Sequence, residues 1–81
     1  MTQDHWLESA TSTLSSILAT DHGVHVDRTL LAATIDRRRS NLMRSLNLPE
    51  TLAEPLLTAA ELRQLAGHIA RAHRRAMPAV A

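Results

Sequence analysis

The sequence predicts an all-α fold, a small four-helix domain with three longer helices and one short helix. Apolar residues recur at intervals of three and four along most of the chain, which is the spacing of one helix face. Trp6 is the sole aromatic residue, so the core must be built from aliphatic side chains, and these suit helix packing. With 81 residues the chain is predicted to form a single domain, residues 1–81, with a frayed tail at about 77–81.

The first helix is predicted over residues 3–20. At about 100° per residue, one stripe collects Trp6, Ala10, Leu14 and Ile17, with Leu7 and Leu18 at its edge. Many serine and threonine side chains in this segment compete for backbone hydrogen bonds, so packing must hold the helix together. Gly23 follows it as a natural terminator.

The second helix is predicted over residues 28–47, with Asp27 as its N-cap. Pro49 ends it, because the residue before a proline is pushed out of the α region. Its apolar stripe consists of Leu31, Ile35, Leu42 and Leu46. Arg38 and Arg39 straddle this stripe, so each must extend its charged end to water or find a partner.

The third and fourth helices are separated by a capping signal. A short helix at residues 50–57 offers Leu52, Leu56 and Leu57 for burial, and Pro55 limits it to one or two turns or kinks it. Thr58 and Glu61 then form a capping box for a last helix that runs to about residue 76. The predicted core face of that helix consists of Leu62, Leu65, Ala66, Ile69 and His73.

The charge balance argues against a protein that binds nucleic acid through a broad positive field. The nine basic residues, all arginine, are offset by eight acids, which leaves a net charge of +1. No apolar run is long enough to cross a membrane, and the N-terminus lacks the pattern of a secretory signal. Cysteine is absent, which excludes disulfides and fits a reducing compartment. We therefore expect a cytoplasmic protein that does not enter a membrane.

Catalytic and metal chemistry are poorly represented. The sequence has no Gly-rich phosphate loop and no Ser-His-acid pattern at a recognisable spacing. His22 and His25, with Asp21 and Asp27 nearby, are potential zinc or nickel ligands, but no second tight pair completes a site. His73 lies on an apolar stripe and is expected to be packed. We therefore expect no enzyme activity, no bound metal and no cofactor.

The strongest charge cluster lies on the second helix. Arg37, Asn41 and Arg44 share a helical face opposite the apolar stripe, and Arg38 borders it. Such a face is typical of a docking surface for an acidic protein, of a nucleic-acid recognition helix, or of an ordinary solvated helix. Leu30 and Met43 point away from the predicted core, so they are further candidates for contact with a partner or with a second copy in a homodimer. The predicted partner-binding residues are Arg37, Arg38, Asn41, Arg44, Leu30 and Met43.

Part of the chain resembles the C-terminal half of acyl and peptidyl carrier domains of polyketide and nonribosomal peptide synthases. The resemblance is carried by Leu46-Asn47-Leu48-Pro49, by Thr58, and by Leu65-Ala66-Gly67-His68-Ile69. It implies a helical domain of the carrier kind, with long helices and one short one. Carriers bear phosphopantetheine on a serine in an Asp-Ser-Leu motif, whereas this chain has Asp27-Arg28-Thr29-Leu30 there.

The leading hypothesis is therefore a non-catalytic protein-protein interaction module. The resemblance implies a docking or degenerate carrier-like accessory domain of a biosynthetic assembly. The alternative is a small nucleic-acid-binding regulator that uses the arginine-rich second helix, and a carrier with covalent cargo ranks third because the serine is missing.

Overall fold

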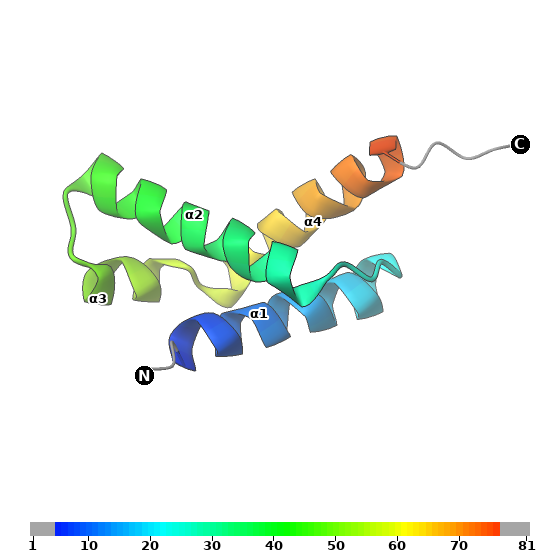
Figure 1. Cartoon of the computed structure of the whole chain (residues 1–81), viewed down its shortest axis with the longest axis horizontal. Helices are drawn as coiled ribbons and strands as arrows, with labels where there is room; N and C mark the ends of the chain where they lie inside the picture. The colour runs from blue at the N-terminus through cyan, green and yellow to red at the C-terminus, as the bar shows by residue number, and fades with distance from the viewer. Residues whose placement is uncertain (1–4, 77–81) are drawn as a thin grey trace, which may run out of the picture.

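The structure is a computed structural model that describes residues 5–76, and it is all-helical over that range (Figure 1). The elements are α1 (His5–Ile17), the π-helical turn η1 (Leu18–His22), α2 (Arg28–Leu46), α3 (Glu50–Ala53), the 3₁₀ turn η2 (Glu54–Leu56) and α4 (Ala59–Ala76). This confirms the predicted class of three longer helices and one short helix. The predicted first two residues of the first helix, 3 and 4, and the predicted frayed tail lie outside the described residues.

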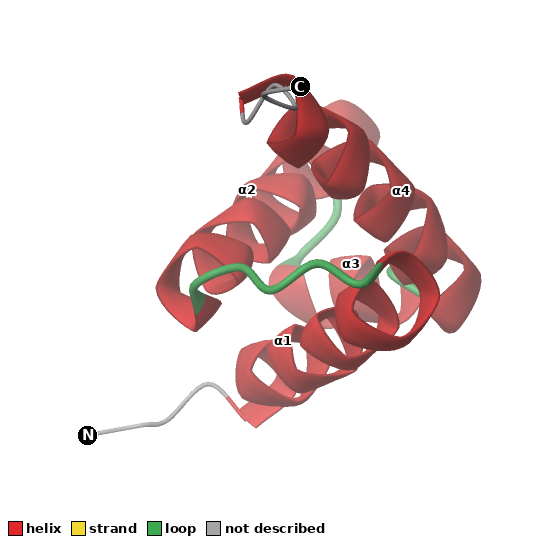
Figure 2. Cartoon of the chain, turned by 90° about the vertical axis from the view of Figure 1, so that its right-hand side faces the viewer, coloured by secondary structure: helices red, strands yellow, loops and turns green. Residues whose placement is uncertain are grey.

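Helix α1 is the centre of the domain. It packs against both α2 and α4, whereas α2 and α4 make few contacts with each other. Viewed along the long axis, the three long helices stand at the corners of a triangle with α1 at the bottom (Figure 2). The fully buried side chains of Leu14, Leu18, Leu31 and Ile35 form the middle of the core. Because α2 and α4 diverge above α1, a groove is left between them.

The buried faces of α1 and α4 differ in detail from the predicted stripes. Leu18, the first residue of η1, is fully buried and Ile17, the last residue of α1, is only partly buried, the reverse of the predicted order. On α4, Leu62, Ala66 and Ala70 form the buried line, while the predicted Leu65 and Ile69 flank it. His73 is partly buried. The small alanines let α4 approach α1 closely, which moves the larger side chains to the edges of the contact.

Three leucines that were predicted to be buried are exposed. Leu46, Leu52 and Leu56 keep 54%, 55% and 42% of their surface in water. The last turn of α2 and all of α3 extend past His5, where the described part of α1 begins (Figure 1). Leu46 and Leu52 belong to these two elements, and the described part of α1 leaves them uncovered. Of the short segment's leucines, only Leu57 is buried.

The helix boundaries follow the predicted signals, but the two caps differ in quality. The Asp27 carboxylate accepts a 2.7 Å hydrogen bond from the backbone N–H of Thr29. The Thr58 hydroxyl accepts only a 3.4 Å bond from the N–H of Glu61. The Glu61 side chain pairs instead with Arg38, so the predicted capping box is only half formed. At its C-terminal end, α2 stops because Asn47 adopts a left-handed conformation, with φ of 53°.

We expect the two caps to contribute unequally to stability. Asp27→Ala should lower the free energy of unfolding by about 1 kcal/mol, because a short N-cap bond is lost. Thr58→Ala should cost clearly less, about 0.5 kcal/mol or below, because the bond removed is long. Urea unfolding followed by circular dichroism measures both values. A larger loss for Thr58→Ala would mean that the cap at α4 is the stronger one.

Candidate functional site

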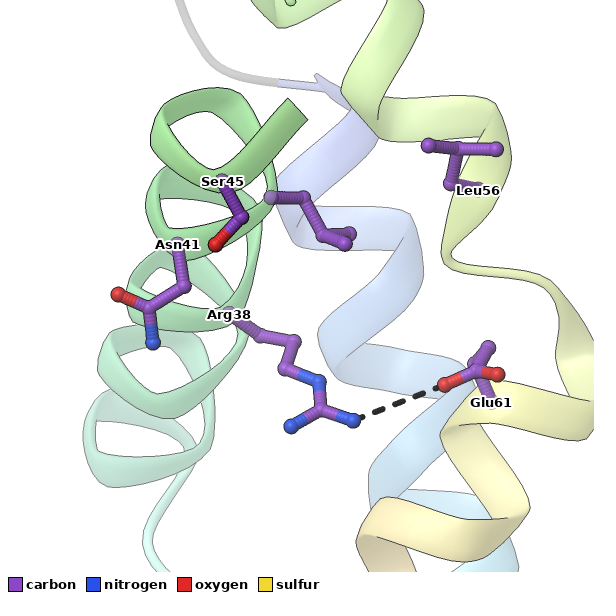
Figure 3. Close-up of a pocket in the computed structure, with 6 residues that line it drawn as sticks. Arg38, Asn41, Ser45, Leu56 and Glu61 are labelled. Carbon is purple, nitrogen blue, oxygen red and sulfur yellow. Dashed lines mark ion pairs between the residues drawn. The ribbon is translucent and has the colours of Figure 1, made fainter. Parts of the chain in front are cut away.

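A groove lies between α2 and the start of α4. It is lined by Arg38, Asn41, Leu42, Ser45, Leu56 and Glu61 and has a volume of about 430 Å³. Figure 3 shows Arg38 and Ser45 on one wall, supplied by α2, and Leu56 and Glu61 on the other, supplied by η2 and α4. Four of its six lining residues are exposed, so the groove is accessible to a ligand from solvent.

One stripe of α2 supplies the first wall. Positions 38, 41, 42 and 45 are three and four residues apart, so they share a helix face. This face lies next to the buried residues Leu31 and Ile35, on the side of α2 from which α4 diverges. Because no helix fills that side, the wall stays accessible.

An ion pair spans the groove from wall to wall. The Arg38 guanidinium lies 3.7 Å from the Glu61 carboxylate, and the two side chains are 48% and 40% exposed. Exposed pairs of this kind contribute about 0–1 kcal/mol, because water competes for both charges. A carboxylate from a ligand can therefore replace Glu61 as the partner of Arg38 at little cost.

Arg39 holds the part of the second wall that η2 supplies in position. Its side chain is buried and donates to Asp36 at 2.7 Å and to Glu54 at 2.8 Å, with Glu50 at 3.6 Å. Its guanidinium also lies 4.8 Å from the centre of the Trp6 ring. One buried arginine thus connects α1, α2 and the α3–η2 segment, and it holds η2, the element that presents Leu56, in place.

The structure brings together only some of the predicted partner-binding residues. Arg38 and Asn41 line the groove, and Arg44 donates a 2.8 Å hydrogen bond to Asn41. Arg37 is exposed and lies on the stripe of α2 next to the one that lines the groove. Leu30 is 62% exposed but sits in the first turn of α2, away from the groove, and Met43 is partly buried on another side. Arg37 and Arg44 do not line the groove, but they flank the lining residue Asn41 on α2, four residues before it and three after it, and are called its rim below; Leu30 and Met43 lie apart.

Sequence reasoning missed the far wall of the groove. Leu56 and Glu61 were assigned to the core and to a cap, and Leu42 to the core stripe. The apolar periodicity of α2 shows which face of that helix is buried. It does not show that α4 diverges from α2. The sequence did contain one signal. Leu52, Leu56 and Leu57 lie on either side of Pro55, and a segment of one or two turns cannot bury three leucines against one neighbour.

The loop after α1 does not form a recognisable metal site. His22 ends η1, and Gly23 follows in a left-handed conformation with φ of 63°. The N–H of Val24 then donates to the carbonyl of Leu18 at 3.0 Å, which closes the turn. Within residues 5–76, no three His, Asp or Glu side chains gather closely enough to hold a metal ion.

No protein-family model, no curated protein and no solved structure matches this chain. Among the described residues, no helix has the length and apolar character needed to span a bilayer. Function must therefore be argued from the groove and the charges around it.

Proposed function

We propose that this protein is a non-catalytic docking module whose groove receives an acidic, amphipathic helix from a partner protein. The observation that carries the proposal is the composition of one open groove, which combines leucine walls with an arginine rim. An amphipathic helix in an apolar groove is a common mode of peptide recognition.

The apolar part of the groove matches the hydrophobic face of a helix. Leu42 and Leu56 line opposite walls, and Leu56 stays 42% exposed. Leu46 and Leu52 are exposed at the same end of the domain (Figure 1). The wall from Arg38 to Ser45 is about 10 Å long, or two helical turns. A partner helix of two to three turns would cover this length with leucine-like residues at intervals of three and four.

The rim favours an acidic partner. Arg37 and Arg44 are exposed, and neither pairs with a carboxylate within residues 5–76. Arg44 contacts only the amide of Asn41, which is a weak partner for a full charge. Arginine pairs strongly with carboxylates through two parallel hydrogen bonds. Acidic residues along one flank of the partner helix would meet these arginines and speed association.

The carrier-like stretch of residues 46–69 suggests a setting for this docking. Carrier domains work by visiting partner proteins within biosynthetic assemblies, and we propose an accessory role of that kind. A carrier with covalent cargo has less support, because α2 begins Arg28-Thr29-Leu30 without the serine. A mass increase after incubation with coenzyme A and a phosphopantetheinyl transferase would overturn this ranking.

We expect selection from a library of helical peptides to identify the charge of the partner. Peptides enriched on the full chain should carry leucine-like residues at three- and four-residue intervals and Asp or Glu along one flank. The double variant Arg37→Glu and Arg44→Glu should weaken the best peptide by tenfold or more, as measured by fluorescence anisotropy. Its circular dichroism spectrum and melting temperature should be nearly unchanged.

A matched control reverses the same number of charges elsewhere. Arg63→Glu with Arg71→Glu, on α4, should leave the peptide affinity within threefold of the original. Enrichment of basic peptides, or equal loss in both double variants, would contradict the proposed groove. A second copy is the alternative occupant, and sedimentation equilibrium distinguishes it, because a homodimer would form through the exposed leucines without any peptide.

A further inference from the structure

The outer face of α4 carries a group of arginines that the groove does not use. Arg63, Arg71, Arg74 and Arg75 are exposed, and His68 lies among them. At about 100° per residue they cover an arc of about 140° on the side opposite the buried line of Leu62, Ala66 and Ala70. From Arg63 to Arg75 the face is about 18 Å long.

The described part of the chain supplies no carboxylate partner for these charges. Within residues 5–76, no carboxylate forms an ion pair with Arg63, Arg71, Arg74 or Arg75. Glu61 is the sole acid of α4, and it pairs across the groove with Arg38. The acids Asp36, Glu50 and Glu54 surround Arg39. The chain is nearly neutral in total, yet one helix face is uniformly positive.

The helix dipole does not explain the arrangement. The negative end of the dipole stabilises cations only within the last turn. His73, Arg74 and Arg75 belong to that turn, but Arg63 and Arg71 do not. Arg71 lies 3.4 Å from the Nδ1 atom of His68, so its neighbour on this face is an imidazole and not an acid. A ligand that carries several negative charges accounts for the whole face.

A glycine lies in the middle of this face. Gly67 is one helical turn from both Arg63 and Arg71, and glycine inside a helix is costly relative to alanine. Nothing in the packing requires it, because a Cβ atom built there meets only the Arg71 guanidinium, at an ordinary 4.0 Å. The absence of a side chain leaves the helix backbone open to close approach between the flanking arginines.

We propose that the outer face of α4 binds the phosphate backbone of duplex DNA. The major groove of B-DNA is wide enough to admit a helix, and phosphates then lie along both of the helix's flanks. Cations spread over an arc of about 140° can reach both flanks, whereas an acidic partner helix would meet one narrow stripe. Arginine also pairs with phosphate through two hydrogen bonds. In Figure 1, α4 runs away from α3, so its far half is open to a long ligand.

This site lies on α4, whereas the sequence suggested the arginine-rich second helix, α2, as the alternative site of nucleic-acid binding. On α2, Arg39 is buried and Arg38 is paired with Glu61, so only Arg37 and Arg44 have no carboxylate partner within residues 5–76. On α4, four such arginines share one broad face. The α4 face and the groove are separate surfaces, so DNA and the groove peptide should bind without competing.

The test is the salt dependence of binding to a fluorescent 20-base-pair DNA duplex, measured by anisotropy with the full chain. Four phosphate contacts predict a slope of about −3.6 in a plot of log affinity against log salt, or roughly a 100-fold loss between 50 and 200 mM. Arg63→Glu with Arg71→Glu should weaken binding by tenfold or more and reduce the slope to about −1.8. Arg37→Glu with Arg44→Glu, the same charge change on α2, should stay within threefold of the original.

A third variant separates shape from charge. Gly67→Leu keeps every charge and should raise the melting temperature, because leucine favours a helix, yet it should weaken DNA binding by fivefold or more. Ala76→Leu adds bulk to α4 off the arginine face and should leave binding unchanged. Equal weakening by the α2 and α4 double variants would overturn the proposal, since net charge would then explain the binding. Unchanged affinity in the α4 double variant, or preference for an acidic peptide at this face, would overturn it as well.

Discussion

Leu14→Ala is expected to cost about 2–5 kcal/mol of folding free energy, as large a loss as truncation of any core side chain in this domain should cause. Leu14 is fully buried on α1, the helix that contacts both α2 and α4. Its removal would leave a cavity at the centre of the core, and a small domain has little stability in reserve, about 5 kcal/mol. Urea unfolding followed by circular dichroism should show a largely unfolded variant at 37 °C.

A half-buried leucine serves as the control for this result. Leu65 lies at the edge of the contact between α4 and α1. Leu65→Ala should therefore cost much less, about 1 kcal/mol, because only part of its surface leaves water on folding. Equal losses at the two positions would show that α1 is not the central helix.

Arg39→Ala is expected to have the largest effect outside the apolar core, a loss of about 2–3 kcal/mol. Breaking a buried ion pair by removing one partner usually costs about 3–5 kcal/mol. We expect less here because Asp36 and Glu50 are 52% and 55% exposed, so their carboxylates can return to water. The contact with the Trp6 ring is lost as well.

Arg39→Met separates packing from charge at this position. Methionine keeps an unbranched apolar side chain beside Trp6, so it should recover at least half of the stability lost in Arg39→Ala. The fluorescence of Trp6, the sole tryptophan, reports directly on its surroundings during unfolding. If Arg39→Ala and Arg39→Met were both as stable as the original, the network around Arg39 would have no structural role.

The helices could be predicted because their signals are local. Asp27 caps the start of α2, Gly23 ends the helical segment before it, and Thr58 precedes α4, as the sequence indicated. Pro49 lies beyond the end of α2, which stops at Asn47. The prediction for Leu46 was wrong because burial depends on whether another helix reaches that turn. Periodicity shows which face of α2 is apolar, but it does not show where α1 begins.

The candidate site was only partly predictable for the same reason. Arg37, Arg38, Asn41 and Arg44 were found from the pattern of a single helix. The opposite wall, Leu56 and Glu61, comes from other elements, and only the relative placement of α2 and α4 brings them together. Arg38 and Arg39 border the same stripe, yet one is exposed and the other is buried. Glu50, Glu54 and the Trp6 ring reach Arg39 from other elements, and no local pattern within α2 shows this.

The most direct test of the docking proposal is an amide chemical-shift map of the full chain with the selected acidic peptide. The proposal predicts the largest shifts at the groove residues Asn41, Leu42, Ser45 and Leu56, and small shifts at Leu30 and along the outer face of α4. Shifts concentrated at Leu30, or on the α4 face around Gly67, would show that the groove between α2 and α4 is not where the partner binds.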